Sequence, residues 1–324
     1  MIIEDGLDAG AFWHTSDPMN EQAKLASGQA AFDLGYRPAF AVSGPERFTW
    51  LNDISTQRFV TGQGSWKTPG FGKTPEGQGL TPGEEVSSLI LDGNGHILHV
   101  FTGFDDGETF HAFTEPGRRD ALLEHLKKMK FLTKVSIDVE ERYPKALRTF
   151  ADGQEQAAEP GLEQAGIWAY EALRIEAGIP RIFVDTDDKT LPNEIAQPHD
   201  NRLGRFVHLK KGCYPGNETV QKVYNRGRPP RRLTLLYIDG SEERLPQLGA
   251  DVTLDGVVVG RMGSSERHYE LGPIGLALVK RNTPLDATLV VDGLAANQEP
   301  IVDPEVGRHV RATATVPLKG KQLL

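Results

Sequence analysis

The sequence contains a single cysteine, Cys213, among its 324 residues. One cysteine excludes a disulfide framework within the chain and a zinc site built from several cysteines, and we predict no metal site. No apolar run approaches the roughly 18 residues that a membrane-spanning helix needs. The first eight residues include three acids and no base, which predicts no secretory signal. We therefore expect a cytoplasmic protein without membrane contacts.

Basic residues are few overall but concentrated in one stretch. The net charge is −9, yet residues 202–232 hold nine Lys and Arg against one acid, a local +8 that leaves −17 for the rest. The plain interpretation is a solvated basic surface. The alternative is a positive field that gathers a small ligand with several negative charges. An acidic surface elsewhere would repel a nucleic-acid backbone, so tRNA is not the favoured partner.

The first half of the chain alternates helical and strand patterns. Residues 62–83 contain ten Gly or Pro in 22 positions and predict a long loop. Asp92-Gly93-Asn94-Gly95 is typical of a hairpin turn between two strands. Together these patterns indicate α+β layers. The expected segments are helices over residues 20–33, 44–54 and 116–130, and strands over 39–43, 87–92, 96–104, 109–113 and 133–139.

The second half changes character. A polar linker is expected over residues 152–160 and a helix over 167–177. From Leu233 onward, short apolar runs separated by Asp-Gly turns predict a small β-barrel or sandwich of about 90 residues. A chain of 324 residues exceeds one ordinary core, so two or three domains are expected.

Cys213 lies in the segment of the chain richest in candidate functional groups. Residues 210–218 read Lys-Lys-Gly-Cys-Tyr-Pro-Gly-Asn-Glu. Lysines such as Lys211 favour the thiolate form of a neighbouring cysteine, which would make Cys213 a functional thiol. The competing interpretation is a small buried cysteine beside a turn.

This segment resembles the signature of the YgfZ family, folate-binding proteins related to the T-protein (aminomethyltransferase) of glycine cleavage. Residues 173–181, Leu-Arg-Ile-Glu-Ala-Gly-Ile-Pro-Arg, and the Leu-Pro-x-Glu at 191–194 match in order and spacing. Gly44-Pro45-Glu46-Arg47 is similar to the family's entry helix, and residues 227–233 are similar to actinobacterial members. One departure is Asn217, where the family usually has glutamine.

The resemblance implies a T-protein-like clover of two interleaved α+β domains, residues 1–228, and a C-terminal β-barrel, residues 229–324. It implies a tetrahydrofolate site in which Glu176 binds the pterin. A carboxylate can accept two parallel hydrogen bonds from a 2-aminopterin edge. The other residues implied to contact a folate, whose tail can be polyglutamylated, are Arg174, Tyr214, Arg226, Arg228 and Arg231.

Three functions follow from the resemblance and the charge pattern. The first is a folate-dependent accessory protein for assembly or repair of iron–sulfur proteins, with client or assembly proteins as partners. The second is an aminomethyltransferase, which needs a carboxylate on the hairpin strand. No Asp or Glu occurs between Asp92 and Asp105, which favours an assembly factor over this enzyme. The third is a tRNA-contacting module that uses the basic stretch.

Overall fold

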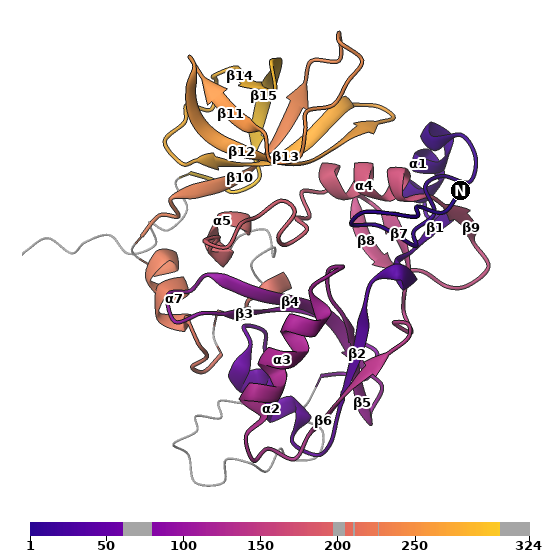
Figure 1. The fold of residues 1–324 in the computed structure, drawn as a ribbon, viewed down its shortest axis with the longest axis vertical. Coiled ribbons are helices and arrows are strands. Elements are labelled where there is room, and N and C mark those ends of the chain that lie inside the picture. Colours follow the sequence, from indigo (N-terminus) through magenta and orange to yellow (C-terminus); the bar gives the residue numbers. More distant parts are fainter. Residues whose placement is uncertain (61–79, 197–204, 210, 226, 305–324) are drawn as a thin grey trace, which may run out of the picture.

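The computed structural model describes residues 1–60, 80–196, 205–209, 211–225 and 227–304. Three β-sheets follow one another along its long axis, with the barrel at one end and a five-stranded sheet at the other (Figure 1). The C-terminal barrel and the α+β class predicted from the sequence are confirmed. No helix in the described part of the chain is long and apolar enough to cross a membrane.

The five-stranded sheet has the order β3-β4-β5-β2-β6, and its neighbours are antiparallel. Two helices pack their apolar side chains onto it, including Trp50 and Leu122. The elements are β2 Ala39–Ser43, α2 Arg47–Ile54, β3 Glu85–Leu91, β4 Ile97–Asp105, β5 Thr109–Phe113, α3 Arg119–Lys130 and β6 Ser136–Glu140.

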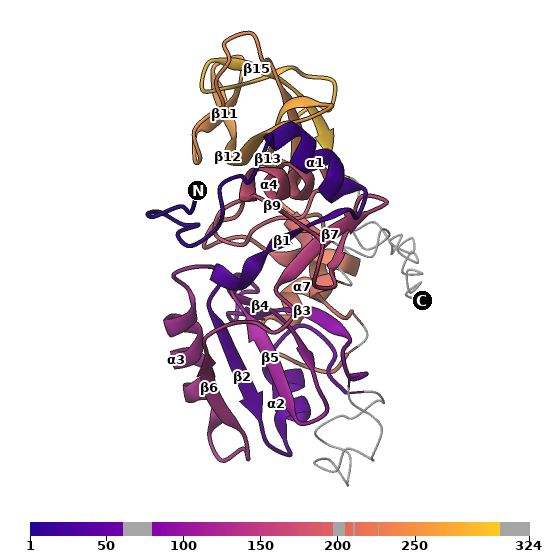
Figure 2. The same ribbon diagram turned by 90° about the vertical axis from the view of Figure 1, so that its right-hand side faces the viewer.

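The four-stranded sheet has the order β8-β7-β1-β9 and lies between the five-stranded sheet and the barrel (Figures 1 and 2). The chain leaves this sheet after β1, builds the whole five-stranded sheet, and returns at β7. The two α+β parts are therefore interleaved. The elements are α1 Pro18–Ala26, β1 Ala30–Asp33, the 3₁₀ turn η1 Leu34–Tyr36, β7 Leu147–Ala151, β8 Gln154–Ala157, β9 Glu163–Ala165 and α4 Ile167–Glu176.

The barrel closes in the order β10-β13-β12-β11-β14-β15. Its last strand was not predicted, because its sequence is largely polar and only alternate residues, such as Leu294 and Ala296, face the interior. The strands are β10 Arg231–Ile238, β11 Asp251–Leu254, β12 Val257–His268, β13 Gly272–Lys280, β14 Leu289–Val291 and β15 Leu294–Pro300. The predicted domain boundary at residue 228 stays a prediction.

Shared apolar clusters connect all three parts. One cluster joins the β3–β4 hairpin to the barrel through α5 (Pro192–Ile195) and α7 (Asn217–Asn225). A second joins the four-stranded sheet to β4 and β5 through Phe104 and Phe113. Helix α4 packs against β12 and β13. Each part therefore contacts the other two, and the parts surround a central region.

Two sequence predictions are wrong. The helix expected over 20–33 ends at Ala26, because Gly28 has a φ of +74° and residues 30–33 form β1 between β7 and β9. The linker expected over 152–160 contains β8, which pairs with β7 around a turn at Asp152 and Gly153. Its polar sequence gave no strand signal. Most of the loop predicted over 62–83 lies outside the described residues.

Candidate functional site

An inner cavity lies at the centre of the molecule, between the two interleaved sheets and the segment that follows α4. Its volume is about 50 Å³. A buried water needs roughly 10–15 Å³ on this measure, so the cavity has room for about four waters. A ligand larger than a few waters can enter this space only if lining side chains move. Its wall comes from β3, β4, β5, β7, β8, α4 and residues 37, 114–115, 179–182 and 205–206.

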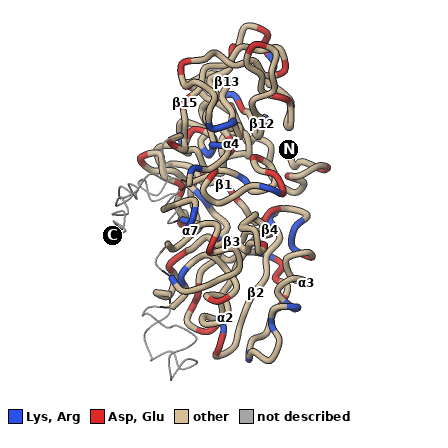
Figure 3. The backbone as a smooth tube through the Cα atoms, turned by 90° about the vertical axis from the view of Figure 1, so that its left-hand side faces the viewer, with Lys and Arg blue, Asp and Glu red and all other residues tan. Residues whose placement is uncertain are grey.

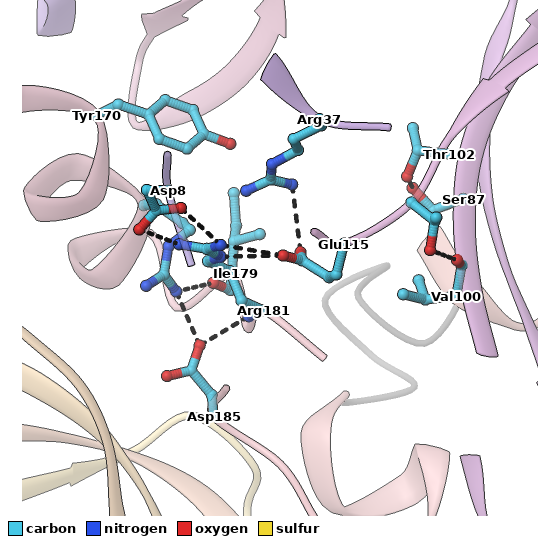
Figure 4. A network of polar contacts seen from close by, with 12 residues as sticks. Asp8, Arg37, Ser87, Val100, Thr102, Glu115, Tyr170, Ile179, Arg181 and Asp185 are labelled. Atoms are coloured by element: carbon cyan, nitrogen blue, oxygen red, sulfur yellow. Dashed lines mark hydrogen bonds and ion pairs between the residues drawn. The ribbon is translucent and has the colours of Figure 1, made fainter. Parts of the chain in front are cut away.

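A buried ion-pair chain forms one end of this cavity (Figure 4). The Arg181 guanidinium lies 3.1 Å from the carboxylate of Glu115 and 2.9 Å from that of Asp8. The other oxygen of Glu115 lies 3.3 Å from Nη1 of Arg37. All three groups at the Glu115 junction are at least nine-tenths buried. Burial makes a charged group expensive unless it is paired, so the Glu115 carboxylate is held in a fixed position between two arginines.

Arg37 is not fully paired. Its Nε and Nη2 are buried and have no hydrogen-bond partner among the described residues. The guanidinium lies 5.7 Å from the centre of the Phe113 ring. Arg37 is one of the residues that line the inner cavity. Arg37 is thus the member of the ion-pair chain whose guanidinium keeps two donors without an acceptor among the described residues.

A second cluster of charged groups lies on the opposite wall. Arg148 donates to Glu85 at 2.8 Å, and Arg205 donates to Glu155 at 2.8 Å. Burial alone would raise the pKa of Glu155. The neighbouring Arg205 and Arg148, with a hydrogen bond from Tyr170, outweigh burial and hold the pKa at about 2. The Glu155 carboxylate is therefore an ionised acceptor rather than a proton donor.

The inner cavity adjoins a larger outer cleft of about 720 Å³, within the range of ligand sites. Glu85, Ser87, Glu155 and Arg205 line both. Two further cations, Arg58 and Lys145, line only the outer cleft. The site thus has a small inner part and a larger outer part that is lined by charged side chains.

Two of the predicted site residues lie on α4, and the structure places them differently. Arg174 lines the inner cavity, where Glu171, Asp185 and the Ile179 carbonyl hold its guanidinium. Glu176, two residues further along the helix, lines neither cavity. Its carboxylate lies 3.2 Å from Nε2 of His268 in the barrel. The pterin contact implied for Glu176 stays a prediction.

Cys213 is exposed and follows a firmly anchored residue. Lys211 Nζ donates to the carbonyls of Asn52, Ser55 and Gln57, at and just beyond the end of α2. Burial lowers the pKa of Lys211 to about 7. Lys211 thus fixes the start of the loop that carries the thiol, and neither Lys211 nor Cys213 lines the two cavities.

Gly216 fixes the other end of this loop. Its φ is +78°, and a Cβ there would lie 2.7 Å from the carbonyl oxygen of Asp92. The loop therefore lies directly against the turn between β3 and β4. The Tyr214 side chain is buried in the apolar cluster beneath, which raises its pKa, and its hydroxyl has no partner among the described residues.

Several cations in the described part of the basic stretch bond within the fold. Arg231 donates to Asp187 and Glu194, and Arg232 is buried and donates to the carbonyls of Lys280 and Thr283. Basic and acidic residues both lie around α7 and near the barrel (Figure 3). Arg228 and Arg231 line neither cavity, and Arg226 lies outside the described residues. Their predicted contacts with a folate tail stay predictions.

Sequence reasoning missed the central ion-pair chain. Arg37 and Glu115 lie 78 positions apart and outside any quoted motif, so nothing in the sequence links them. Arg181, by contrast, ends the Gly-Ile-Pro-Arg segment that carried the resemblance. No group of three potential metal ligands was found among the described residues. The β4 residues that line the inner cavity are Val100, Phe101 and Thr102, and none of them is a carboxylate.

Comparison with a solved structure supports the α+β fold with a C-terminal barrel. The aminomethyltransferase T of the glycine cleavage system from Bartonella henselae has the same fold, with a TM-score of 0.66, 15% identity and 95% of each chain covered. The sequence matches no family model. The fold is thus that of a T-protein-like α+β protein with a C-terminal barrel.

Curated proteins with similar sequences add a more specific resemblance than the fold does. The tRNA-modifying protein YgfZ of Shigella dysenteriae is 38% identical over 96 residues, or 30% of this chain and 26% of that protein. Its counterpart in Escherichia coli is 40% identical over 83 residues, or 26% of this chain and 24% of that protein. The matched stretch thus spans about a quarter of each relative. These findings confirm the resemblance predicted from the motifs, to YgfZ-type and T-protein-like proteins.

Proposed function

We propose that this protein binds a reduced folate, with the pterin in the inner cavity and the aminobenzoyl-glutamate tail in the outer cleft. The observation that carries the proposal is the two-part site, a small inner cavity that adjoins a cleft of about 720 Å³. The inner cavity is the smaller of the two spaces, and the planar pterin is the thinner part of the ligand. The longer and charged remainder of the molecule needs the outer space.

The groups on the walls suit the chemistry of the ligand. A pterin edge carries both hydrogen-bond donors and an acceptor, and the inner cavity presents the Glu115 carboxylate beside the Arg37 guanidinium. Tail carboxylates are best met by cations at the outer cleft, where Arg58, Lys145 and Arg205 lie. Three acids share this cleft, and two of them, Glu85 and Glu155, are already paired with arginines.

The proposed role is that of an accessory protein in the assembly or repair of iron–sulfur proteins. The β4 residues that line the inner cavity include no carboxylate, and Glu85, Glu115 and Glu155 are each held by arginine. This arrangement favours holding a folate over aminomethyl transfer. Cys213, exposed on an anchored loop, is the group best placed to meet a partner protein.

Titration with tetrahydrofolate, followed by tryptophan fluorescence and by calorimetry, tests the binding step. We expect saturable binding that Thr102→Phe abolishes, since Thr102 lines the inner cavity and a phenyl ring would fill it. Circular dichroism and the melting temperature confirm that the variant folds. Absence of saturable binding to the wild-type protein would refute the proposal. Glu176→Ala tests the pterin contact implied by the resemblance, and an unchanged affinity would place the pterin away from Glu176.

A second candidate is contact with tRNA, which the names of the curated relatives suggest. Binding of this kind weakens steeply with salt, because cations on the protein displace counterions from phosphates. A filter-binding series from about 50 to 200 mM salt separates tRNA binding from folate binding. Tight, salt-sensitive tRNA binding would favour the second candidate, and recognition of the pterin should change little with salt.

A further inference from the structure

We propose that the turn between α3 and β6 contacts an anionic membrane surface, with two apolar side chains among the lipid headgroups and lysines against the lipid charges. The turn comprises residues 131–135, and this inference does not rest on the proposed folate site. It departs from the expectation of a protein without membrane contacts, which followed from the lack of a long apolar run. A turn that lies on a membrane needs no such run.

The α3–β6 turn lies at the end of the five-stranded sheet that points away from the barrel (Figures 1 and 2). Strand β2 enters this sheet at Ala39, shortly after β1 and η1 of the central sheet, and ends at Ser43. Ser43 pairs with Ser136, the first residue of β6, so the turn before β6 lies at this outer end. A flat surface can therefore approach the turn without meeting the barrel.

Two large apolar side chains project from the turn. Phe131 is 88% exposed and Leu132 is 84% exposed, the two highest values among the large apolar side chains of the described residues. Met129, the last residue but one of α3, adds a third exposed apolar group. Apolar groups gathered on a surface mark an interaction site. Side chains this exposed form a convex tip, which a protein partner could cover only with a matching deep pocket and which lipid headgroups can surround.

The backbone of Phe131 is unfavourable for a bulky residue. Its φ is +44° and its ψ is −118°, and a positive φ favours glycine. The exposed ring gains no burial within the described chain that would offset this strain. Strained residues concentrate at functional sites. The position therefore points to a contact outside the chain.

Two hydrogen bonds hold the ends of this region in place. Nε1 of Trp50, on α2, donates to the carbonyl of Met129 at 3.1 Å. The N–H of Lys134 donates to the carboxylate of Glu46 at 2.7 Å. The backbone on both sides of the two apolar residues is thus anchored to α2, which keeps their side chains directed away from the core.

Positive charge accompanies the apolar pair and determines the sign of the surface that fits it. Residues 124–134 hold four lysines against one acid, a local charge of +3 in a chain of net charge −9. The acid, Glu124, pairs with Lys128 at 2.6 Å. The other lysines are Lys127, Lys130 and Lys134. Lysines beside an exposed apolar group are typical of binding to anionic lipid, because a single weak signal gives only marginal attachment.

Acids at the same end of the sheet are set to one side of the turn. Asp106 and Glu108 lie between β4 and β5, and β2 separates β5 from β6. Asp106 pairs with His111 at 3.1 Å. These acids oppose an approach in which the whole end of the sheet lies flat on an anionic surface, so the contact is made by the α3–β6 turn.

Vesicle binding tests the proposal. The wild-type protein is mixed with vesicles of phosphatidylcholine alone, or of phosphatidylcholine and phosphatidylglycerol in equal amounts, and the bound fraction is measured by sedimentation. We expect binding to the mixed vesicles that is roughly tenfold or more tighter than binding to the neutral ones. This binding should weaken as the salt concentration rises.

Phe131→Gly separates binding from folding. Glycine relieves the backbone strain, so the melting temperature should not fall. Loss of the ring should weaken binding to the mixed vesicles by roughly 10- to 100-fold. Lys127→Gln combined with Lys130→Gln should weaken it by roughly 5- to 30-fold, at about a factor of five for each lysine near the surface.

The matched controls change exposed residues elsewhere in the molecule. Val257, 63% exposed on the barrel, is replaced in Val257→Ser, and Lys189→Gln removes an exposed charge outside the turn. Both variants should bind the mixed vesicles as the wild type does. Equal weakening in the controls would show that the contact is not made by the turn and would overturn the proposal.

Three other results would also overturn it. These are no wild-type binding to the mixed vesicles, equal binding to both kinds of vesicle, and unchanged binding by Phe131→Gly. A protein that ignores vesicles but self-associates in sedimentation velocity, and loses this in Phe131→Gly, would assign the turn to a second copy of the chain instead of lipid.

Discussion

Glu266 allows the sharpest test of how the barrel and α4 meet. It lies on β12, half-buried, and its only hydrogen bond among the described residues comes from the N–H of Arg267. Burial raises the pKa of Glu266 to about 7, and the nearby Glu171 adds to this effect. Folding therefore places a carboxyl group where its ionised form is disfavoured.

The sign of the pH dependence follows from proton binding. Between pH 4.5 and about 7 the unfolded chain has released this proton and the folded chain retains it. Stability must then fall as the pH rises through this window, and the full penalty is present above it. One pKa unit corresponds to about 1.4 kcal/mol. Multiplying the whole rise in pKa by this value would overstate the penalty, because water reaches the half-buried carboxyl. We expect a penalty of about 1–3 kcal/mol at pH 8.

Glu266→Gln should remove this penalty, because glutamine has the shape of the protonated acid and no charge to lose. Urea unfolding at pH 4.5 and pH 8 measures the effect as a difference of differences. The variant should match the wild type at the acid end and exceed its free energy of unfolding by about 1–3 kcal/mol at pH 8. Glu159→Gln, at an exposed position, serves as the control. A stability difference between Glu266→Gln and wild type that does not vary with pH would refute the reasoning.

Three further predictions concern other parts of the chain. Burial lowers the pKa of His111, but hydrogen bonds with Asp106 and Glu140 raise it more. The stabilisation by the protonated ring is therefore full below about pH 6.5 and is lost as the pH rises. His111→Gln should lower the free energy of unfolding by roughly 0.5–1.5 kcal/mol at pH 5.5 and by less at pH 8.5, and a larger loss at pH 8.5 would contradict this. Gly216→Ala should lower the free energy of unfolding by about 1–3 kcal/mol more than Gly117→Ala does. Both glycines have positive φ, but only at Gly216 do backbone atoms lie where a Cβ would be. Equal losses in urea denaturation would show that the contact of Gly216 with the β3–β4 turn does not matter. Cys213→Ser should leave the melting temperature and folate affinity unchanged while activity in an iron–sulfur enzyme complementation assay is lost. Native Cys213 should react with iodoacetamide because it is exposed. Full complementation by the variant would mean that the thiol has no role.

Local patterns in the sequence predicted much of the architecture. The Asp-Gly turns between short apolar runs indicated the barrel, and Asp92 to Gly95 indicated the hairpin of β3 and β4. Spacing of this kind depends only on neighbouring residues, so it can be read without the fold. Where local signals misled, a tertiary partner was the reason. Residues 30–33 form a strand because β7 and β9 pair with them on both sides.

The motifs also predicted the resemblance to the YgfZ family, since Lys-Gly-Cys-Tyr and Leu-Arg-x-Glu-Ala-Gly are short runs with specific spacing. They could not determine which of their residues face a cavity. On α4, Arg174 and Glu176 are two positions apart, about 200° around the helix, so only one of them can point to the centre. The structure directs Arg174 inward and pairs Glu176 with His268 of the barrel.

The central cavity itself was decided by tertiary structure alone. Its ion-pair chain joins Asp8, Arg37, Glu115 and Arg181, which come from four separate parts of the sequence. Each of these residues, taken singly, is an ordinary charged residue that would be expected at the surface. Only the interleaving of two sheets and the packing of the segment after α4 bury them together, because burial is a property of the whole fold and a charge becomes a binding group once water is removed from around it.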